Sequence, residues 1–277
     1  MLISDLIDKF LAYCLRHRAP ATLAFYRTRL RQFCRKFNSR DLASLTPLEI
    51  DEHLAEVGTG VSDSTRHHNA LALERLQKFA LDHKLLDRPA FGKLEKPRVG
   101  QRDRLPTPEE TAAILAQSSP AFRLIYSALR QCGARPGELC RAAIADVDRA
   151  ACVITLKEHK TARKTGKPRR IPIGRKFGEL LDQAIGSRTE GPVFLAPAGR
   201  AWTVSNLSRT YSRIRDNAGL PKDLVLYLAR HECGTKICRE KGVEYARRLL
   251  GHTNISTTQR YMHLGDRDLA EAQDLVE

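Results

Sequence analysis

Residues 89–106, PAFGKLEKPRVGQRDRLP, interrupt a chain whose flanking segments follow helical patterns. The stretch is rich in proline, glycine and basic residues and poor in large apolar ones. Proline removes a backbone donor and fixes φ, so regular elements rarely continue through such a stretch. We therefore predict a linker at 89–106 between one domain at 1–88 and a second at 107–277. A chain of 277 residues is long enough to bury two cores.

The first domain is predicted to be all helical, with about four helices. Apolar residues recur at helical spacing over 21–37 and again over 63–84. Thr46 stands before a proline and three residues before Glu49, which is the pattern of a capped helix start. The basic side chains of 21–37 lie mostly off its apolar face, so this helix can pack on one side and face DNA on the other. A solvated basic face explains the pattern of this helix equally well.

The second domain is predicted to be mainly helical with a small antiparallel sheet. Thr107 repeats the capping pattern seen at Thr46. The predicted helices cover 108–117, 120–131, a segment from about 136 and most of the chain after 203, and the predicted strands cover 151–156, 169–173 and 193–197.

The connection between the first two predicted strands, KEHKTARKTGKP, is crowded with positive charge. Nine lysines and arginines and one acidic residue occupy 157–176. The whole chain carries 47 Lys and Arg against 32 Asp and Glu, a net charge of +15. Such an excess favours a polyanion such as a phosphate backbone. Binding to ribosomes or acidic partners is the alternative, and charge alone does not choose. The candidate DNA-binding residues are Arg27, Arg31, Arg35, Arg163, Lys167 and Arg169.

Neither the N-terminus nor the cysteines indicate a secreted or metal-binding protein. The start, MLISDLIDKF, lacks a signal-peptide pattern, and no apolar run reaches membrane-spanning length, so we expect a cytoplasmic protein. The seven cysteines are scattered without a CxxC pair, which argues against a disulfide framework and a zinc ribbon.

Two arginines stand in segments suited to phosphodiester chemistry. Cleavage without a metal needs a nucleophile, guanidinium groups for the charge that grows on the phosphate oxygens, and an acid for the leaving oxygen. Arg135, in CGARPGELC, begins a predicted helix, and Glu138 can orient it or cap the helix. Arg230, in LYLARHECGTKI, has apolar neighbours, and a charge buried there is costly unless it is paired. Taken singly, each residue also fits an ordinary structural role.

The order Arg135, basic hairpin, Arg230, His252 and Tyr261 resembles the tyrosine recombinase family: phage integrases, Xer-type resolvases and transposon recombinases. GARPGEL is similar to its first arginine segment and KTGKPRRIPI to its lysine-bearing hairpin. LYLARHECGT and LLGHTNISTTQRYMHL resemble its second arginine segment and its nucleophile segment. The resemblance covers essentially the whole chain. It implies a helical SAM-like core-binding domain followed by a mixed α+β catalytic domain of the DNA breaking-rejoining fold.

The resemblance also implies a role for each matching residue. Tyr261 would attack the scissile phosphate and form a 3′-phosphotyrosyl bond, while Arg135 and Arg230 hold the non-bridging oxygens. His252 would add a hydrogen bond, and a hairpin lysine would protonate the leaving 5′ oxygen. No metal or ATP is required, because the protein–DNA bond retains the energy for rejoining.

The implied partner is double-stranded DNA with an inverted-repeat recombination site, bound by a homo-tetramer on paired sites. The implied setting is a bacterial or phage-encoded, nucleoid-associated protein. Two alternatives stay open: a non-catalytic DNA-binding protein on the same scaffold, and a relaxing activity like that of a type IB topoisomerase.

Two positions depart from the family pattern or leave a choice. Tyr227 stands where most members have histidine, and a phenol with a reference pKa of about 10 is no base near neutral pH. The hairpin offers two lysines for the acid. Lys164, eight positions before Pro172, matches the usual spacing, and Lys160 fits if the hairpin carries an insertion.

Overall fold

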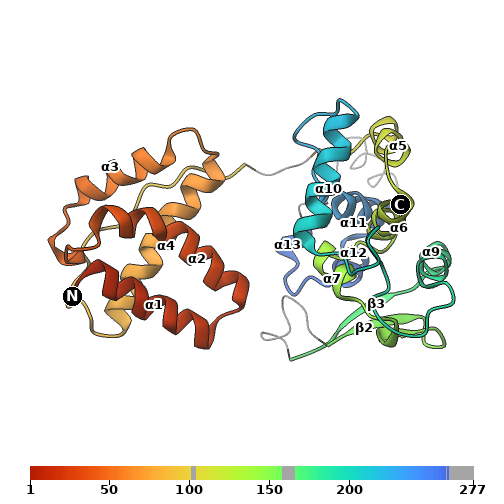
Figure 1. Cartoon of the computed structure of the whole chain (residues 1–277), viewed down its shortest axis with the longest axis horizontal. Helices are drawn as coiled ribbons and strands as arrows, with labels where there is room; N and C mark the ends of the chain where they lie inside the picture. The colour runs from red at the N-terminus through yellow and green to blue at the C-terminus, as the bar shows by residue number, and fades with distance from the viewer. Residues whose placement is uncertain (101–103, 158–165, 260, 262–277) are drawn as a thin grey trace, which may run out of the picture. The chain divides into compact units, whose positions relative to one another are not determined.

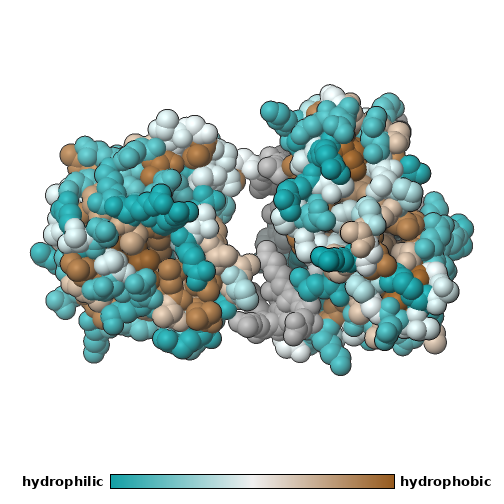
Figure 2. All heavy atoms as spheres, viewed as in Figure 1, coloured by the Kyte–Doolittle hydropathy of each residue, from teal (hydrophilic) through white to brown (hydrophobic). Residues whose placement is uncertain are grey.

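The computed structural model describes residues 1–100, 104–157, 166–259 and 261. The chain divides into two compact units, Met1–Arg102 and Asp103–Glu277, and each is described by itself (Figure 1). Figure 2 shows a mainly hydrophilic surface on the visible face of each unit, with separate apolar patches. Within the described ranges, no helix is long and apolar enough to cross a bilayer.

The first unit is helical, as predicted. Helices α1 and α2 pack against each other, and α1, α2 and α3 all contact α4. Their apolar faces enclose a core that includes Phe10, Leu30, Phe33 and Leu76. The helices are α1 (Ile3–His17), α2 (Pro20–Phe37), α3 (Pro47–Gly58) and α4 (Asp63–Asp82), with a 3-10 turn at Leu42–Ser44. The Thr46 cap is present, because the Thr46 hydroxyl accepts from the Glu49 backbone N–H at 3.2 Å.

The first part of the predicted linker is held by the helical unit. The buried Gln77 of α4 donates to the Phe91 carbonyl at 2.9 Å and accepts from the Ala90 and Phe91 backbone N–H groups. Phe91 is itself part of the core. These hydrogen bonds satisfy the polar backbone groups of Ala90 and Phe91, which belong to an extended segment outside any β-ladder. The composition of 89–106 therefore indicated a break in helical structure, although part of the segment is anchored.

The second unit is mainly helical with one three-stranded antiparallel sheet among its described residues, as predicted. The strands run in the order β1-β2-β3, with Ile154 opposite Ile171 and Leu156 opposite Arg169. The strands are β1 (Val147–Asp148), β2 (Val153–Leu156) and β3 (Arg169–Pro172). The helices are α5 (Pro108–Ala116), α6 (Pro120–Cys132), α7 (Pro136–Arg141), α9 (Arg175–Ile185), α10 (Val204–Asn217), α11 (Leu228–Lys241), α12 (Val243–Leu250) and α13 (Ser256–Gln259), with a 3-10 turn at Ile144–Asp146.

The strand predicted at 193–197 was wrong. Val193 and Phe194 are fully buried in the core, but the segment makes only single bridges, such as Leu195 with Ala201. Pro192, just before the segment, and Pro197, its last residue, cannot donate to a ladder. The third strand of the sheet is instead the two-residue β1. Helix α9 was not predicted, although Phe177 and Leu181 bury one of its faces.

Helix α11 is the centre of the second unit. It packs against α6 and α12 (Figure 1). Arg130 of α6 donates to both carboxylate oxygens of Glu232, so the two helices are also joined by a charged pair. Two neighbouring helices end in a left-handed glycine, Gly133 after α6 and Gly251 after α12. Both turns direct their backbone toward the same end of α11.

The cap of α5 provides a stability test. The Thr107 hydroxyl accepts from the Glu110 backbone N–H at 3.2 Å, and the Glu110 carboxylate accepts from the Thr107 N–H at 2.9 Å. Thr107→Ala should lower the free energy of unfolding by about 1 kcal/mol, because the first acceptor is lost. Urea denaturation measures the change. Thr107→Ser keeps the oxygen and should remain close to the parent, and equal stability of the two variants would contradict the cap.

Candidate active site

The guanidinium of Arg230 is fully buried in the second unit, where the residue is 1% exposed. One terminal nitrogen donates to the Gly133 carbonyl at 2.7 Å, and the other donates to the Leu250 carbonyl at 2.7 Å. Burial lowers the pKa of Arg230, and the nearby Arg135 acts in the same direction. The buried Nε has no hydrogen-bond partner among the described residues. A buried guanidinium held only by neutral groups, with a donor still unmatched, is suited to bind an anion.

His252 is placed by Arg230 on one side and by α13 on the other. Arg230 Nη2 lies 2.9 Å from His252 Nε2, and His252 Nδ1 lies 2.8 Å from the Thr258 hydroxyl. A guanidinium nitrogen can only donate, so Nε2 accepts and the proton sits on Nδ1. His252 is therefore neutral in this arrangement and presents a buried imidazole beside the arginine.

Tyr261 lies against the same imidazole. Its ring is parallel to that of His252, with an interplanar angle of 7° and centroids 6.1 Å apart. The residue is 4% exposed, and its backbone N–H donates to the Thr258 carbonyl at 2.9 Å. Gly234 of α11 leaves room for it, since a Cβ there would lie 3.2 Å from the tyrosine ring. The predicted nucleophile thus lies beside His252, which Arg230 contacts, so two of the predicted phosphate ligands are next to it.

Arg135 is fixed by its own carboxylate partner. It stands immediately before α7, where its Nη1 donates to Glu138 at 2.8 Å and its backbone N–H donates to the other oxygen at 2.9 Å. Glu138 is 1% exposed. Burial alone would raise its pKa, but the charge of Arg169 and the hydrogen bonds from Arg135 outweigh burial and lower it. The carboxylate is therefore ionised; it orients Arg135 and also caps the start of α7, so it fills both roles considered from the sequence.

Tyr227, at the start of α11, is 39% exposed. Its ring centroid lies 5.3 Å from that of His231, which in turn lies 5.3 Å from that of Tyr261. Tyr227 also raises the pKa of Arg230, opposite to the effect of burial. The residue that replaces the usual histidine is therefore near the site, with its face open to solvent.

The hairpin residues Lys160, Arg163 and Lys164 lie outside the described residues. Lys167 is described and exposed. Arg169 differs from the predicted DNA-contacting residues that the structure describes, Arg27, Arg31, Arg35 and Lys167, because its side chain is 6% exposed and turned into the unit. The strand alternation explains this: Leu156 and Arg169 face the core side of the sheet, while Arg170 points outward.

Thr258, whose hydroxyl bonds His252 Nδ1, was not identified from the sequence. Its position six residues after His252 is the pattern that could have indicated it.

In the first unit, Arg27, Arg31 and Arg35 are all exposed on α2. Their four-residue spacing places them in one stripe along the helix. The DNA contact predicted for these three residues stays a prediction, and their exposure leaves the stripe accessible to a phosphate backbone.

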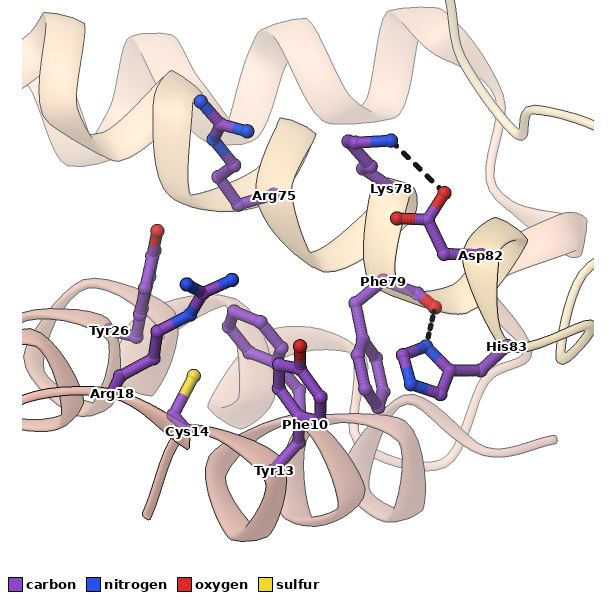
Figure 3. A pocket seen from close by; sticks show the side chains of 10 residues that line it. All are labelled: Phe10, Tyr13, Cys14, Arg18, Tyr26, Arg75, Lys78, Phe79, Asp82 and His83. Atoms are coloured by element: carbon purple, nitrogen blue, oxygen red, sulfur yellow. Dashed lines mark hydrogen bonds and ion pairs between the residues drawn. The ribbon is translucent and has the colours of Figure 1, made fainter. Parts of the chain in front are cut away.

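A small pocket adds a second basic feature to the first unit. It has a volume of about 100 Å³ and lies between α1, α2 and α4. Figure 3 shows the guanidinium groups of Arg18 and Arg75 and the hydroxyl of Tyr26 gathered on one side of it. The Lys78 ammonium group forms an ion pair with Asp82 at 3.0 Å. Burial raises the pKa of Tyr26, against the opposing effect of Arg75 and Arg18, so its hydroxyl remains a donor.

Comparisons with known proteins identify relatives in sequence and in fold. Relatives include proteins named tyrosine recombinase XerC from Chromohalobacter salexigens, 25% identical over 97% of this chain and 94% of the relative, and from Pelobacter propionicus, 26% identical over 94% and 90%. Similar solved structures include a lambda integrase dimer bound to a COC′ core site, with a TM-score of 0.80 and 18% identity over 96% of this chain and 78% of that one. A Tn1549 transposon integrase in complex with transposon right end DNA has a TM-score of 0.77 and 19% identity over the full length of both chains.

Family models account for both units. The model described as "Phage integrase, N-terminal SAM-like domain" matches residues 7–84. The model described as "Phage integrase family" matches residues 107–267, which is more than half of the chain and contains every residue of the candidate active site. The chain therefore belongs to the phage integrase family of tyrosine recombinases.

Proposed function

We propose that this recombinase cuts and rejoins double-stranded DNA through Tyr261, with Arg135, Arg230 and His252 around the scissile phosphate. The observation that carries the proposal is the buried Arg230 guanidinium, which contacts His252 while the Tyr261 ring is stacked on that same histidine. An anion drawn to the arginine would lie within the reach of the phenol.

Each step follows from the chemistry of the side chains. The Tyr261 oxygen attacks phosphorus and passes its proton to water, and the bond from phosphorus to the 5′ oxygen breaks. The departing 5′ oxygen takes a proton from a hairpin lysine, Lys164 or Lys160. Two guanidinium groups stabilise the charge on the non-bridging oxygens. The product is a 3′-phosphotyrosyl bond, and attack by the 5′-hydroxyl of a partner strand reverses the step and exchanges strands.

His252 must change its hydrogen bonding when phosphate enters. Its Nε2 accepts from Arg230 in the DNA-free arrangement. Protonation of Nε2 would turn that nitrogen into a donor toward a phosphate oxygen and release Arg230 Nη2 for the same phosphate. The positive charge gained by the imidazole would be stabilised by the bound anion.

Two DNA segments have to be held together for strand exchange, so we propose a homo-tetramer on paired sites with inverted repeats. A similar solved structure is a lambda integrase tetramer bound to a Holliday junction, with a TM-score of 0.78. A cytoplasmic, nucleoid-associated protein is the setting that fits this activity.

The nucleophile is tested with a nicked duplex that traps the covalent product. Tyr261→Phe should abolish the protein–DNA adduct on a denaturing gel, because the attacking oxygen is gone while the packed ring remains. DNA affinity should stay within about twofold, since no phosphate-binding charge is removed. Tyr245→Phe is the matched control, because Tyr245 is 66% exposed on α12 and should still form the adduct. An adduct in Tyr261→Phe would exclude Tyr261 as the nucleophile.

The proton donor is tested with Lys160→Ala and Lys164→Ala on normal DNA and on DNA with a 5′-phosphorothiolate at the scissile position. A thiolate leaves without a proton, so only the variant that lacks the acid should recover. We expect Lys164→Ala to slow cleavage by about 10²- to 10⁴-fold and to recover with the sulfur substrate. Lys167→Ala serves as the control for loss of a hairpin charge. Recovery of Lys160→Ala alone would assign the acid to Lys160, and recovery of neither would exclude both.

The pocket of the first unit is proposed to hold one DNA phosphate. Arg18→Ala and Arg75→Ala should each weaken DNA binding and reduce the slope of log K against log salt by about 1, because one phosphate contact is lost. Fluorescence anisotropy over a salt series measures both. Lys9→Ala removes an exposed charge of α1 that does not line the pocket and should leave the slope unchanged. If Lys9→Ala reduced the salt slope as much as Arg75→Ala, a specific phosphate contact in the pocket would be contradicted.

A further inference from the structure

We infer that Arg169 is a positioning residue that holds the first arginine segment and the histidine segment in their phosphate-binding geometry. The inference rests on the proposed function and adds a residue to it. Arg169 was predicted to contact DNA, but its guanidinium lies inside the unit, between β3, α7 and the end of α12.

The end of α12 is attached directly to this guanidinium. Arg169 Nη2 donates to the Leu249 carbonyl at 2.5 Å, and Nη1 donates to the Arg170 carbonyl at 2.7 Å. The Leu249 carbonyl is among the last acceptors of α12, which have no partner within the helix. Three residues further on stands His252, so the bond fixes the turn that delivers the imidazole.

Gly251 shows how closely the two segments fit. A Cβ at Gly251 would lie 2.9 Å from both the central carbon and Nη1 of Arg169, and the φ of +65° at this position also favours glycine. The backbone before His252 therefore rests on the flat guanidinium. A shorter or unbranched side chain at 169 would leave this backbone without support.

The second link runs through Glu138 to Arg135. Arg169 Nε lies 3.6 Å from a Glu138 carboxylate oxygen, and both residues are buried. The other Glu138 oxygen accepts from Arg135 Nη1 at 2.8 Å. One carboxylate therefore lies between two guanidinium groups, that of Arg169, which is 6% exposed, and that of Arg135, which is 18% exposed. Loss of Arg169 would leave Glu138 with a single cation and change both the position and the available charge of Arg135.

The Arg169 side chain is buried because it joins three parts of the second unit. Arg169 belongs to β3, contacts the backbone before His252, and pairs with the carboxylate that orients Arg135. Its hydrogen bonds go to backbone carbonyls and its ion pair goes to Glu138. Its effect on the reaction would pass through residues that do.

The test compares Arg169→Met with Arg170→Met, because the two arginines are neighbours on one strand and only the first is buried. With the nicked duplex, Arg169→Met should form adduct at least about tenfold more slowly, while its DNA affinity stays within about twofold. Arg170→Met should do the reverse, with weaker binding at low salt and an unchanged rate of adduct formation. Thermal melting verifies that both variants are folded.

A second substrate separates positioning from general loss of structure. A methylphosphonate at the scissile position lacks one charged oxygen, so misplaced guanidinium groups matter less. The defect of Arg169→Met should shrink on this substrate in parallel with that of Arg135→Ala. If Arg169→Met fails to fold, Arg169→Lys takes its place with the same expected substrate dependence, because it keeps the buried charge but lacks the planar fork that donates to two carbonyls.

The outcomes distinguish the inference from the function on which it rests. Adduct formation by Arg169→Met at the parent rate, or a defect equally large on both substrates, would overturn the positioning role. Absence of adduct from the parent protein itself would instead overturn the proposed function.

Discussion

The fully buried guanidinium of Arg230 is the constraint on which the site depends. A buried charge is costly unless polar groups surround it, and here the surrounding groups are two carbonyls and a neutral imidazole. They come from the ends of α6 and α12 and from the turn after α12. Two helix ends and a histidine are thus organised around one cation whose charge they do not neutralise. The charge of Arg230 is therefore left without a carboxylate partner among the described residues, and such a charge can attract an anion.

The charged groups around Arg230 also carry an excess of positive charge. Arg135 and Arg169 share the carboxylate of Glu138, and Arg230 stands beside neutral partners. Three guanidinium groups against one carboxylate leave a positive region near the Tyr261 ring. Such fixed charges can stabilise a pentacoordinate phosphate without reorganising during the reaction. The phenol can therefore remain a packed aromatic residue until a phosphate lies beside it.

The sequence predicted the parts of this structure that local patterns determine. The threonine caps, the two helix-rich units and the β2–β3 pairing follow from spacing and turn residues, and the order of arginine, histidine and tyrosine indicated the site. Burial through tertiary contacts was not predictable in the same way. Arg169 is one of nine basic residues in 157–176, and only its register opposite Leu156 turns it inward. The segment 193–197 has strand-like composition, but core packing and flanking prolines leave it without a ladder.

The central claim is that Arg135, Arg230 and His252 meet at one phosphate. The most direct measurement is a crystal structure of Tyr261→Phe bound to an intact recombination site. Our account predicts the scissile phosphate within about 3 Å of nitrogen atoms from all three residues, with the ring at position 261 facing the phosphorus. A phosphate bound away from Arg230, with that guanidinium still donating to the imidazole and the two carbonyls, would contradict it.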